Sequence, residues 1–372
     1  MDIGYFLKLM ADKGASDMFL TTGAPVYIKV EGKLYPLGST GLPPGMVKKI
    51  AYSLMDEGQV PAFERDLEMN MAIAVKDAGR FRVNVFKQRG EVGMVIRAIK
   101  SEIPSIEALK LPATLQTLIM EPRGLILVVG STGSGKSTAL ASMIDHRNSS
   151  STGHILTIED PIEYLHRHKK SIVNQREVGL DTHAFHAALK NAMREAPDVI
   201  LIGEILDATT MESAIAFAET GHICLATLHS NNADQTLERI LNFFPENAHK
   251  NILMNLALNL KAVISLRLVK GVDGKRLPAT EILINTPMIR DLIRRGQVHE
   301  IKTAMESSLQ EGMQSFDQAL FRLYKDGKIE LDEALRSADS RDGLSLRIRL
   351  SEGSDNLGGG DNLNSGDTFT GY

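Results

Sequence analysis

One run of nine residues restricts the fold of this chain most: Gly130, Ser131, Thr132, Gly133, Ser134, Gly135, Lys136, Ser137 and Thr138. The apolar run 125–129 before it predicts a buried parallel strand, and residues 139–144 after it predict a helix. The three glycines let backbone N–H groups surround phosphate oxygens at a helix N-terminus. We expect Lys136 to reach the β- and γ-phosphates and Ser137 to bind Mg²⁺. The pattern therefore predicts a nucleoside triphosphate site rather than a glycine-rich turn that binds nothing.

Length and composition exclude several classes of protein. The 372 residues suit two or three domains, each large enough to bury its own core. The net charge of −4 disfavours a protein that binds nucleic acid through bulk positive charge. Cys224 is the one cysteine, which rules out a disulfide framework and a cysteine-rich zinc site. Without an 18-residue apolar run or a basic leader, the sequence predicts a cytoplasmic protein.

Hydrophobic periodicity divides the chain into an α+β part and an α/β part. Residues 1–99 predict an α+β domain with helices over 5–13 and 44–56 and strands over 18–20, 26–30, 33–36, 69–75, 80–85 and 92–99. Residues 100–112 contain Pro104 and Pro112 and predict a linker with one short helix. Residues 113–352 alternate between strands and helices, which is typical of a parallel sheet. Residues 353–372 are rich in Gly, Asn, Asp and Ser and predict a disordered tail.

The expected elements of the second part follow from the same periodicity. Its strands are predicted over 125–130, 154–159, 172–175, 199–203 and 223–228. Helices are predicted after residues 130–138, which form the phosphate-binding P-loop, and over 183–195, 208–219 and 233–243. The segments 246–268 and 285–336 are predicted to be further helices on one side of the core.

Two acidic segments follow expected strands of the second part. Strand 199–203 ends at Glu204, a Walker B pattern whose carboxylate can reach Mg²⁺ directly or through water. The segment 159–164 holds the carboxylates of Glu159, Asp160 and Glu163. It is either a solvated turn or a loop in which one carboxylate orients an attacking water.

Two histidines lie at the two ends of the segment 222–229. Their spacing of seven residues places them on opposite faces of a straight strand, so a shared metal site is not expected. His222 is expected to make a structural or subunit contact. His229 is either a sensor of the γ-phosphate or an ordinary residue at a strand end.

Taken together, these motifs resemble the secretion ATPase superfamily and, within it, the type IV pilus retraction ATPases of the PilT and PilU kind. The resemblance covers residues 1 to about 350, in blocks at 14–18, 79–84, 130–138, 159–164, 203–204, 218–229, 289–294 and 312–317. The segments 175–179 and 216–229 are most similar to the PilU branch.

The resemblance implies a fold and a set of site residues. It implies a RecA-like P-loop ATPase core with an N-terminal PAS-like domain, assembled as a homohexamer with nucleotide between domains and subunits. Glu163 would activate the attacking water, Glu204 would serve Mg²⁺, and His229 would sense the γ-phosphate. The resemblance also implies that Arg82 and Arg97 approach the phosphates, whereas the residues alone would make both ordinary strand-surface residues.

The expected function is a motor that hydrolyses ATP, with Mg²⁺, to retract type IV pili at the cytoplasmic face of the inner membrane. Its expected partners are an inner-membrane platform protein of the pilus and a paralogous retraction ATPase, with no nucleic acid and no zinc. The four-cysteine zinc motif of assembly-type relatives is impossible in a chain with one cysteine.

Three other functions are alternatives to this one. The family often has Arg two residues after the Walker B Glu, where this chain has Leu206. This departure favours the alternative of an accessory ring that binds ATP and assists a partner motor. A RecA-like nucleic-acid translocase is disfavoured by the acidic composition with 5% aromatic residues, and a small-molecule kinase by the lack of a recognisable lid.

Overall fold

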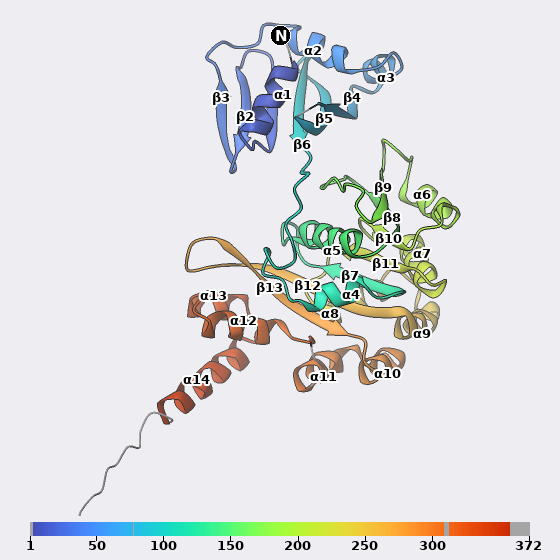
Figure 1. The fold of residues 1–372 in the computed structure, drawn as a ribbon, viewed down its shortest axis with the longest axis vertical. Coiled ribbons are helices and arrows are strands. Elements are labelled where there is room, and N and C mark those ends of the chain that lie inside the picture. The colour runs from blue at the N-terminus through green and yellow to red at the C-terminus, as the bar shows by residue number, and fades with distance from the viewer. Residues whose placement is uncertain (1–2, 77, 309–311, 358–372) are drawn as a thin grey trace, which may run out of the picture.

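The computed structural model describes residues 3–76, 78–308 and 312–357. Among them, the N-terminal part folds as an antiparallel sheet of six strands in the order β3-β2-β1-β6-β5-β4, drawn at the top of Figure 1. Its elements are α1 (Ile3–Asp12), β1 (Asp17–Leu20), β2 (Val26–Val30), β3 (Lys33–Leu37), α2 (Met46–Leu54), α3 (Gln59–Asp66), β4 (Glu68–Val75), β5 (Gly79–Gln88) and β6 (Glu91–Ala98). The predicted α+β domain is therefore confirmed.

The core of this domain lies on one face of its sheet. Phe81, Val83 and Val85 alternate along β5 and are buried in a cluster that includes Leu7 and Met10 of α1. Because neighbouring residues of a strand point to opposite faces, Arg82 lies on the other face. The strand pattern thus frees one face of β5 for contacts outside the domain core.

The helix predicted over 44–56 is confirmed as α2, which spans Met46–Leu54. The pattern does not predict the next helix, α3. Asp56 Oδ1 accepts the N–H groups of Gly58 and Gln59, both at 2.9 Å, and so turns the chain into α3.

The second part folds around a sheet of seven strands in the order β13-β12-β7-β11-β10-β8-β9, counted over the described residues. All neighbouring strands are parallel except β12 and β13. Its elements are α4 (Thr114–Ile119), β7 (Gly124–Val129), α5 (Lys136–Ser150), β8 (Gly153–Glu159), β9 (Ser171–Glu177), α6 (Phe185–Ala192), η1 (Met193–Glu195), β10 (Val199–Ile202), α7 (Ala208–Glu219), β11 (Ile223–Leu228), α8 (Ala233–Leu241), η2 (Glu246–Ala248), α9 (His249–Asn259), β12 (Leu260–Lys270), β13 (Arg276–Ile284), α10 (Pro287–Arg295), η3 (Val298–Glu300), α11 (Ile301–Ser307), α12 (Phe316–Lys325), α13 (Leu331–Ser337) and α14 (Arg341–Leu357).

The prediction of helices throughout 246–268 is wrong for its second half. Helix α9 ends at Asn259 and strand β12 begins at the next residue, and the strand β13 was not expected. Strand β12 lies between β7 and β13, so residues such as Val263 and Ile264 are buried on both of its faces. Residues 262–266 are all buried, and all but Ser265 are apolar, so no alternation separates this strand from a buried helix.

The predicted short helix within the linker 100–112 is also wrong, because residues 106–110 form turns and α4 starts after Pro112. The linker is held against the second part of the chain. Leu165 N–H donates to the carbonyl oxygen of Lys100 at 2.9 Å, and Ser142 Oγ donates to that of Pro104 at 2.5 Å.

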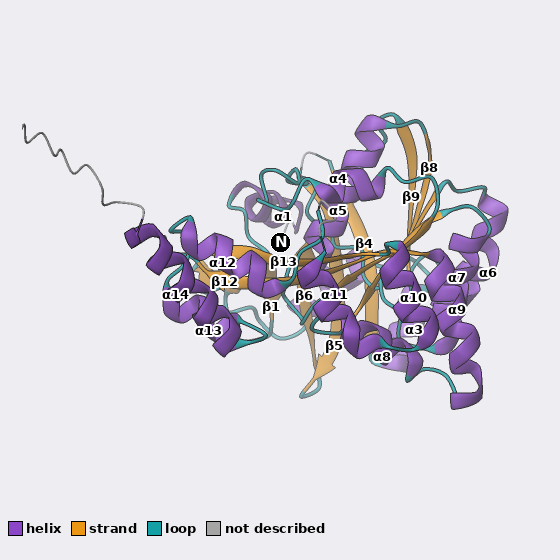
Figure 2. Ribbon diagram, turned by 90° about the horizontal axis from the view of Figure 1, so that it is seen from below, coloured by secondary structure: helices purple, strands orange, loops and turns teal. Residues whose placement is uncertain are grey.

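Helices cover both faces of the seven-stranded sheet (Figure 2). Leu125, Leu127 and Val129 of β7 pack with α6 to α11, whereas Ile126 and Val128 pack with α4 and α5. Strand β7 is therefore central and buried on both sides. Since β7, β8, β10 and β11 are parallel, their carboxyl ends meet at one edge of the sheet.

The last helices pack on the far ends of β12 and β13. Val269 and Leu277 share a cluster with Phe316 of α12 and Leu344 of α14. Helix α14 extends away from the core in Figure 1 and includes residues 353–357 of the predicted tail, while residues 358–372 lie outside the described residues. Within the described ranges, no helix is both long and apolar enough to cross a membrane.

Candidate functional site

The P-loop begins at a residue that only glycine can occupy. Gly130 has φ 147°, and a Cβ atom there would lie 2.5 Å from both the carbonyl oxygen of Leu266 and Ser134 Oγ. Gly135 has φ 97° and leads directly into α5. The loop can therefore wind tightly between β7 and α5 with its backbone N–H groups available to an anion.

Lys136 lies folded back over this loop. Its Nζ donates to the carbonyl oxygens of Gly130 at 2.7 Å and Ser131 at 3.1 Å. Burial lowers the pKa of Lys136, and the charge of Glu204 opposes that shift. Ser134 Oγ is buried and has no hydrogen-bond partner among the described residues. A half-buried ammonium beside an unpaired buried hydroxyl fits a loop built to take up phosphate oxygens.

A cavity of about 580 Å³ opens over the P-loop, a volume in the usual range for small-molecule sites. Its lining includes most of the predicted site: Thr132, Gly133, Gly135, Lys136, Ser137, Thr138, Glu163, Glu204 and His229. Ser131 and Ser134 line a neighbouring cavity of about 670 Å³, which shares Thr132 and Gly133 with the first. The edge of the parallel sheet thus brings together residues from four separate segments of the sequence.

Glu204 and His229 lie just beyond the ends of the adjacent strands β10 and β11, and their side chains are in contact. His229 Nε2 is 2.9 Å from Glu204 Oε1, and both side chains remain partly exposed to the cavity. Thr227 Oγ1 donates to the carbonyl oxygen of Gly203 at 2.5 Å and joins the same two strand ends. His222 lies at the other end of β11, where its Nδ1 is 3.1 Å from Thr220 Oγ1.

The acidic segment 159–164 divides its carboxylates between two tasks. Glu159 accepts from Thr157 Oγ1 at 2.6 Å and from Gln175 Nε2 at 3.3 Å, and burial raises the pKa of Glu159. The backbone N–H of Glu163 also points to the Glu159 carboxylate. Glu163 itself is exposed and lines the cavity. Glu159 therefore braces the loop, and Glu163 is free to act on a ligand.

Arg82 and Arg97 are directly opposite each other on β5 and β6. Neither is among the described residues that line the cavity over the P-loop. Arg97 Nε donates to Asp17 Oδ1 at 2.7 Å; this hydrogen bond raises the pKa of Arg97, and the charge of Glu163 acts in the same direction. Arg82 Nε lies 3.5 Å from Glu177 Oε1 at the end of β9. The structure brings the two arginines together, with carboxylates as their partners.

Four residues that the sequence did not single out also line the cavity: Lys100, Tyr164, His166 and Arg276. The Tyr164 hydroxyl is 2.9 Å from Thr138 Oγ1, and Lys100 Nζ lies over the Tyr164 ring, 5.5 Å from its centroid. Burial lowers the pKa of His166 to about 4, which keeps its ring neutral at pH 7. Tyr164 is the last residue of the acidic segment and His166 follows it closely, so both could have been found there. Arg276 begins the unexpected strand β13, so no sequence signal pointed to it.

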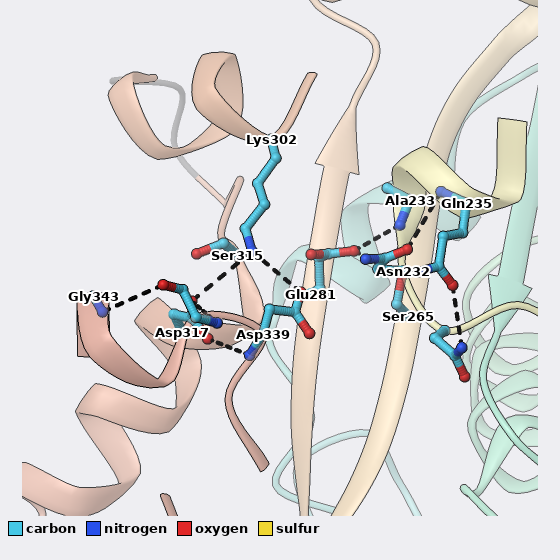
Figure 3. Close-up of polar contacts among 12 residues, drawn as sticks. Asn232, Ala233, Gln235, Ser265, Glu281, Lys302, Ser315, Asp317, Asp339 and Gly343 are labelled. Carbon is cyan, nitrogen blue, oxygen red and sulfur yellow. Dashed lines mark hydrogen bonds and ion pairs between the residues drawn. The ribbon is translucent and has the colours of Figure 1, made fainter. Parts of the chain in front are cut away.

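A buried carboxylate supports the loop that follows His229. Glu281 of β13 accepts the N–H of Ala233 at 2.8 Å and the Ser265 hydroxyl at 3.0 Å (Figure 3). Asn232 Oδ1 caps the same helix by accepting the N–H of Gln235 at 3.3 Å. Burial raises the pKa of Glu281 to about 7. These contacts fix the start of α8 against β12. His229 shortly precedes α8, and β12 lies beside β7, the strand that leads into the P-loop.

A second polar cluster fastens the C-terminal helices. Asp317 accepts the N–H groups of Asp339 at 2.8 Å and Ser340 at 3.0 Å, and Lys302 Nζ lies 3.6 Å from Asp339 Oδ2 (Figure 3). Arg267 binds Asp339 Oδ1 at 2.6 Å and donates to the carbonyl oxygen of Asn231 at 3.3 Å. The C-terminal helices are thereby tied to the loop after β11.

Leu206 stands where the family often has an arginine. It lies in the short connection between strand β10 and helix α7. Its side chain is 60% exposed. The next residue, Asp207, caps α7 by accepting the N–H of Thr210 at 2.7 Å. Leu206 therefore presents an apolar side chain on the outside of the site, beside a well-formed helix start.

Comparisons with known proteins agree with this architecture. The family model of the type II/IV secretion system protein matches residues 10–300. The chain is 52% identical over 356 residues to the type IV pilus ATPase PilU of Pseudomonas aeruginosa, covering 95% of this chain and 93% of that protein. It is 41% identical over 338 residues to the type IV pilus retractation ATPase PilT of the same organism, covering 91% and 98%.

A solved structure extends the agreement to three dimensions. The crystal structure of the pilus retraction motor PilT with bound ADP superimposes with a TM-score of 0.86 at 42% sequence identity, covering 93% of this chain and 99% of that one. The RecA-like core and the greater similarity to PilU than to PilT are thus confirmed as predicted. This chain belongs to the type II/IV secretion system protein family, in the branch that includes the pilus ATPases PilU and PilT.

Proposed function

We propose that this chain is a motor ATPase that hydrolyses ATP to drive type IV pilus retraction and twitching motility. The observation that carries the proposal is the cavity over the P-loop, where Lys136, Glu163, Glu204 and His229 converge from four segments. The similarity to PilU and PilT along almost the whole chain supports the biological role.

The proposed chemistry is phosphoryl transfer to water. Ser137 and Glu204 would hold Mg²⁺, which offsets phosphate charge when bound. Lys136 exchanges its contacts with the loop carbonyls for the β- and γ-phosphates, and the N–H groups of residues 130–138 surround the phosphate oxygens. Glu163 orients the attacking water, and His229, held by Glu204, monitors the γ-phosphate. All of these residues except Gly130, Ser131 and Ser134 line the cavity, which supports the assignment.

We propose further that the working unit is a homohexamer at the inner face of the inner membrane. In it Arg82 and Arg97 would complete the site when the domains close, and the ring would engage a platform protein of the pilus. The proposed boundaries are 1–99 for the N-terminal PAS-like domain, 100–112 for the linker and 113–352 for the ATPase domain. The start of α4 after Pro112 supports the last boundary.

A second function is favoured by one observation, the exposed Leu206. A leucine cannot donate hydrogen bonds or carry charge, so it cannot make the polar contact of an arginine at this position. An accessory ring that binds ATP but works mainly with a paralogous motor would tolerate this loss.

ATP turnover of the purified full chain tests both functions, with the mass of the assembly measured in the same buffer. Lys136→Ala serves as the control, because its contacts are to the P-loop rather than the core. We expect turnover in the wild-type protein and its loss in Lys136→Ala, with the fold intact. Turnover that survives Lys136→Ala contradicts the enzyme proposal, and ATP binding without turnover selects the accessory ring.

A further inference from the structure

Glu177 is a buried carboxylate at the junction of the two domains. It is the last residue of β9, and its side chain is 1% exposed. Its Oε2 accepts the backbone N–H of Ile162 at 3.2 Å. Its Oε1 has no hydrogen-bond partner among the described residues and faces Arg82 Nε of the N-terminal domain at 3.5 Å. One carboxylate thus contacts two parts of the chain that the sequence separates widely.

The N-terminal domain supplies the countercharge that Glu177 needs. A buried carboxylate is costly unless a positive charge or hydrogen bonds compensate it. Burial raises the pKa of Glu177, while the Ile162 N–H and the charges of Arg82 and Arg80 oppose this shift. The Ile162 N–H and the two arginines of β5 therefore act together to compensate the charge of Glu177.

The other oxygen of Glu177 controls the loop that carries Glu163. Ile162 immediately precedes Glu163, and its side chain is buried, so the Ile162 backbone is fixed from both sides. Glu159, on the next strand, holds the N–H of Glu163, and Val178 N–H donates to the Glu159 carbonyl oxygen at 2.9 Å. The end of β9 and the acidic segment therefore form one hydrogen-bonded unit.

We propose that Glu177 is a positioning residue that couples the placement of the N-terminal domain to that of Glu163, with Arg82 as its partner. While Arg82 faces Glu177, the carboxylate holds Ile162 and the acidic segment in place. When the N-terminal domain moves away with Arg82, Glu177 loses its direct ion-pair partner and holds the segment less firmly. The proposal deepens the proposed ATPase function, because the role of Glu163 rests on it.

Hydrogen exchange of the full-length protein tests the coupling without any need for turnover. We compare backbone exchange in residues 160–165 between the wild type, Glu177→Gln and Arg82→Gln. Arg176→Gln is the matched control, because Arg176 also lies on β9 but pairs with Glu195 at 2.8 Å within the second domain. Faster exchange in the first two variants and not in the control supports the coupling. Unchanged exchange in Arg82→Gln overturns it, and this arm holds even if Glu177→Gln fails to fold.

A double-mutant cycle on ATP turnover gives the functional test. Loss of loop placement should lower kcat by about 10- to 100-fold in each single variant while KM stays unchanged. The double variant should be no slower than the slower single variant, and Arg82→Lys should recover part of the loss. Effects that multiply in the double variant would show that the two residues act separately and would overturn the proposal. If no protein turns over ATP, the ATPase function fails, while hydrogen exchange still decides the coupling.

Discussion

At the scale of single residues, the structure separates three carboxylates that look equivalent in the sequence. Glu159, Asp160 and Glu163 lie within one short segment. Glu159 turns inward and holds the loop, whereas Glu163 is exposed to the cavity. Their roles therefore differ by environment, which spacing alone does not reveal.

This difference predicts the behaviour of Glu163→Gln. The amide keeps the size of the side chain but cannot act as a base-like carboxylate, so turnover should fall at least ~100-fold while ATP binding persists. Turnover and equilibrium binding of ATP are measured on the same preparation. Glu204→Gln is the comparison, because loss of the Glu204 carboxylate should weaken the binding of Mg²⁺ instead. Normal hydrolysis of ATP by Glu163→Gln would show that the acidic segment is only a turn and that Glu163 has no catalytic role.

A second prediction at this scale concerns Glu281. Its pKa in the folded protein, about 7, lies above the ordinary 4.5, so the folded state holds this proton more tightly than the unfolded state. This contribution favours folding below about pH 4.5 and is lost as the pH rises to about 7. A shift of this size corresponds to at most about 3 kcal/mol.

Glu281→Gln should remove this pH dependence, because the amide stays neutral. The stability of the variant relative to the wild type should therefore increase between pH 5 and pH 7, because only the wild type loses the contribution of this proton. Denaturant unfolding at a series of pH values measures the difference. A difference that stays constant over this range would mean that Glu281 is ionised in both states.

At the scale of elements, helix starts place several of the functional loops. Asp207 caps α7 just after the strand that carries Glu204, and Asn232 caps α8 just after His229. Such caps satisfy backbone N–H groups that would otherwise lack partners at the helix start. The two caps therefore fix the backbone that follows Glu204 and the backbone that follows His229.

Removal of the first cap should be measurable. Asp207→Ala deprives the Thr210 N–H of its acceptor and should lower the free energy of unfolding by about 1 kcal/mol. Asp207→Asn retains an acceptor oxygen and serves as the control. Equal stability of Asp207→Ala and the wild type would show that water replaces the cap at no cost.

At the scale of the whole molecule, we propose that Arg97 of the N-terminal domain completes the site on the other domain. In the structure Asp17 holds Arg97, and the charge of Glu163 reaches it. If Arg97 completes the site after domain closure, Arg97→Ala should lower turnover by up to ~10³-fold and leave nucleotide binding intact. Asp17→Asn is the control, because it releases Arg97 without removing it. An equal loss in both variants would assign Arg97 a structural role only.

Assembly gives the last prediction at this scale. If the site is shared between subunits, ATP turnover per chain should rise with protein concentration until rings are complete. Turnover and mass are followed together across a dilution series. A fully active monomer at low concentration would contradict both the shared site and the ring.

Much of the architecture was predictable from local pattern. The P-loop lies between its expected strand and helix, and the turn at Glu31 and Gly32 joins β2 to β3 with positive φ at both residues. These features depend on neighbouring residues, so the sequence carries them. The strand β12 did not follow from the pattern, because a strand buried on both faces has no alternation.

The sequence by itself determined the phosphate-binding loop and the placement of Glu204 and His229 at strand ends. The loop is one contiguous motif, and parallel strands end at the same edge of a sheet. Only the tertiary structure decided that Arg276 enters the cavity and that Arg82 meets Glu177. These contacts join residues that lie far apart in the chain, and strand order and domain packing bring them together. The local sequence pattern contains neither the strand order nor the domain packing, because both depend on the free energy of burying the whole core.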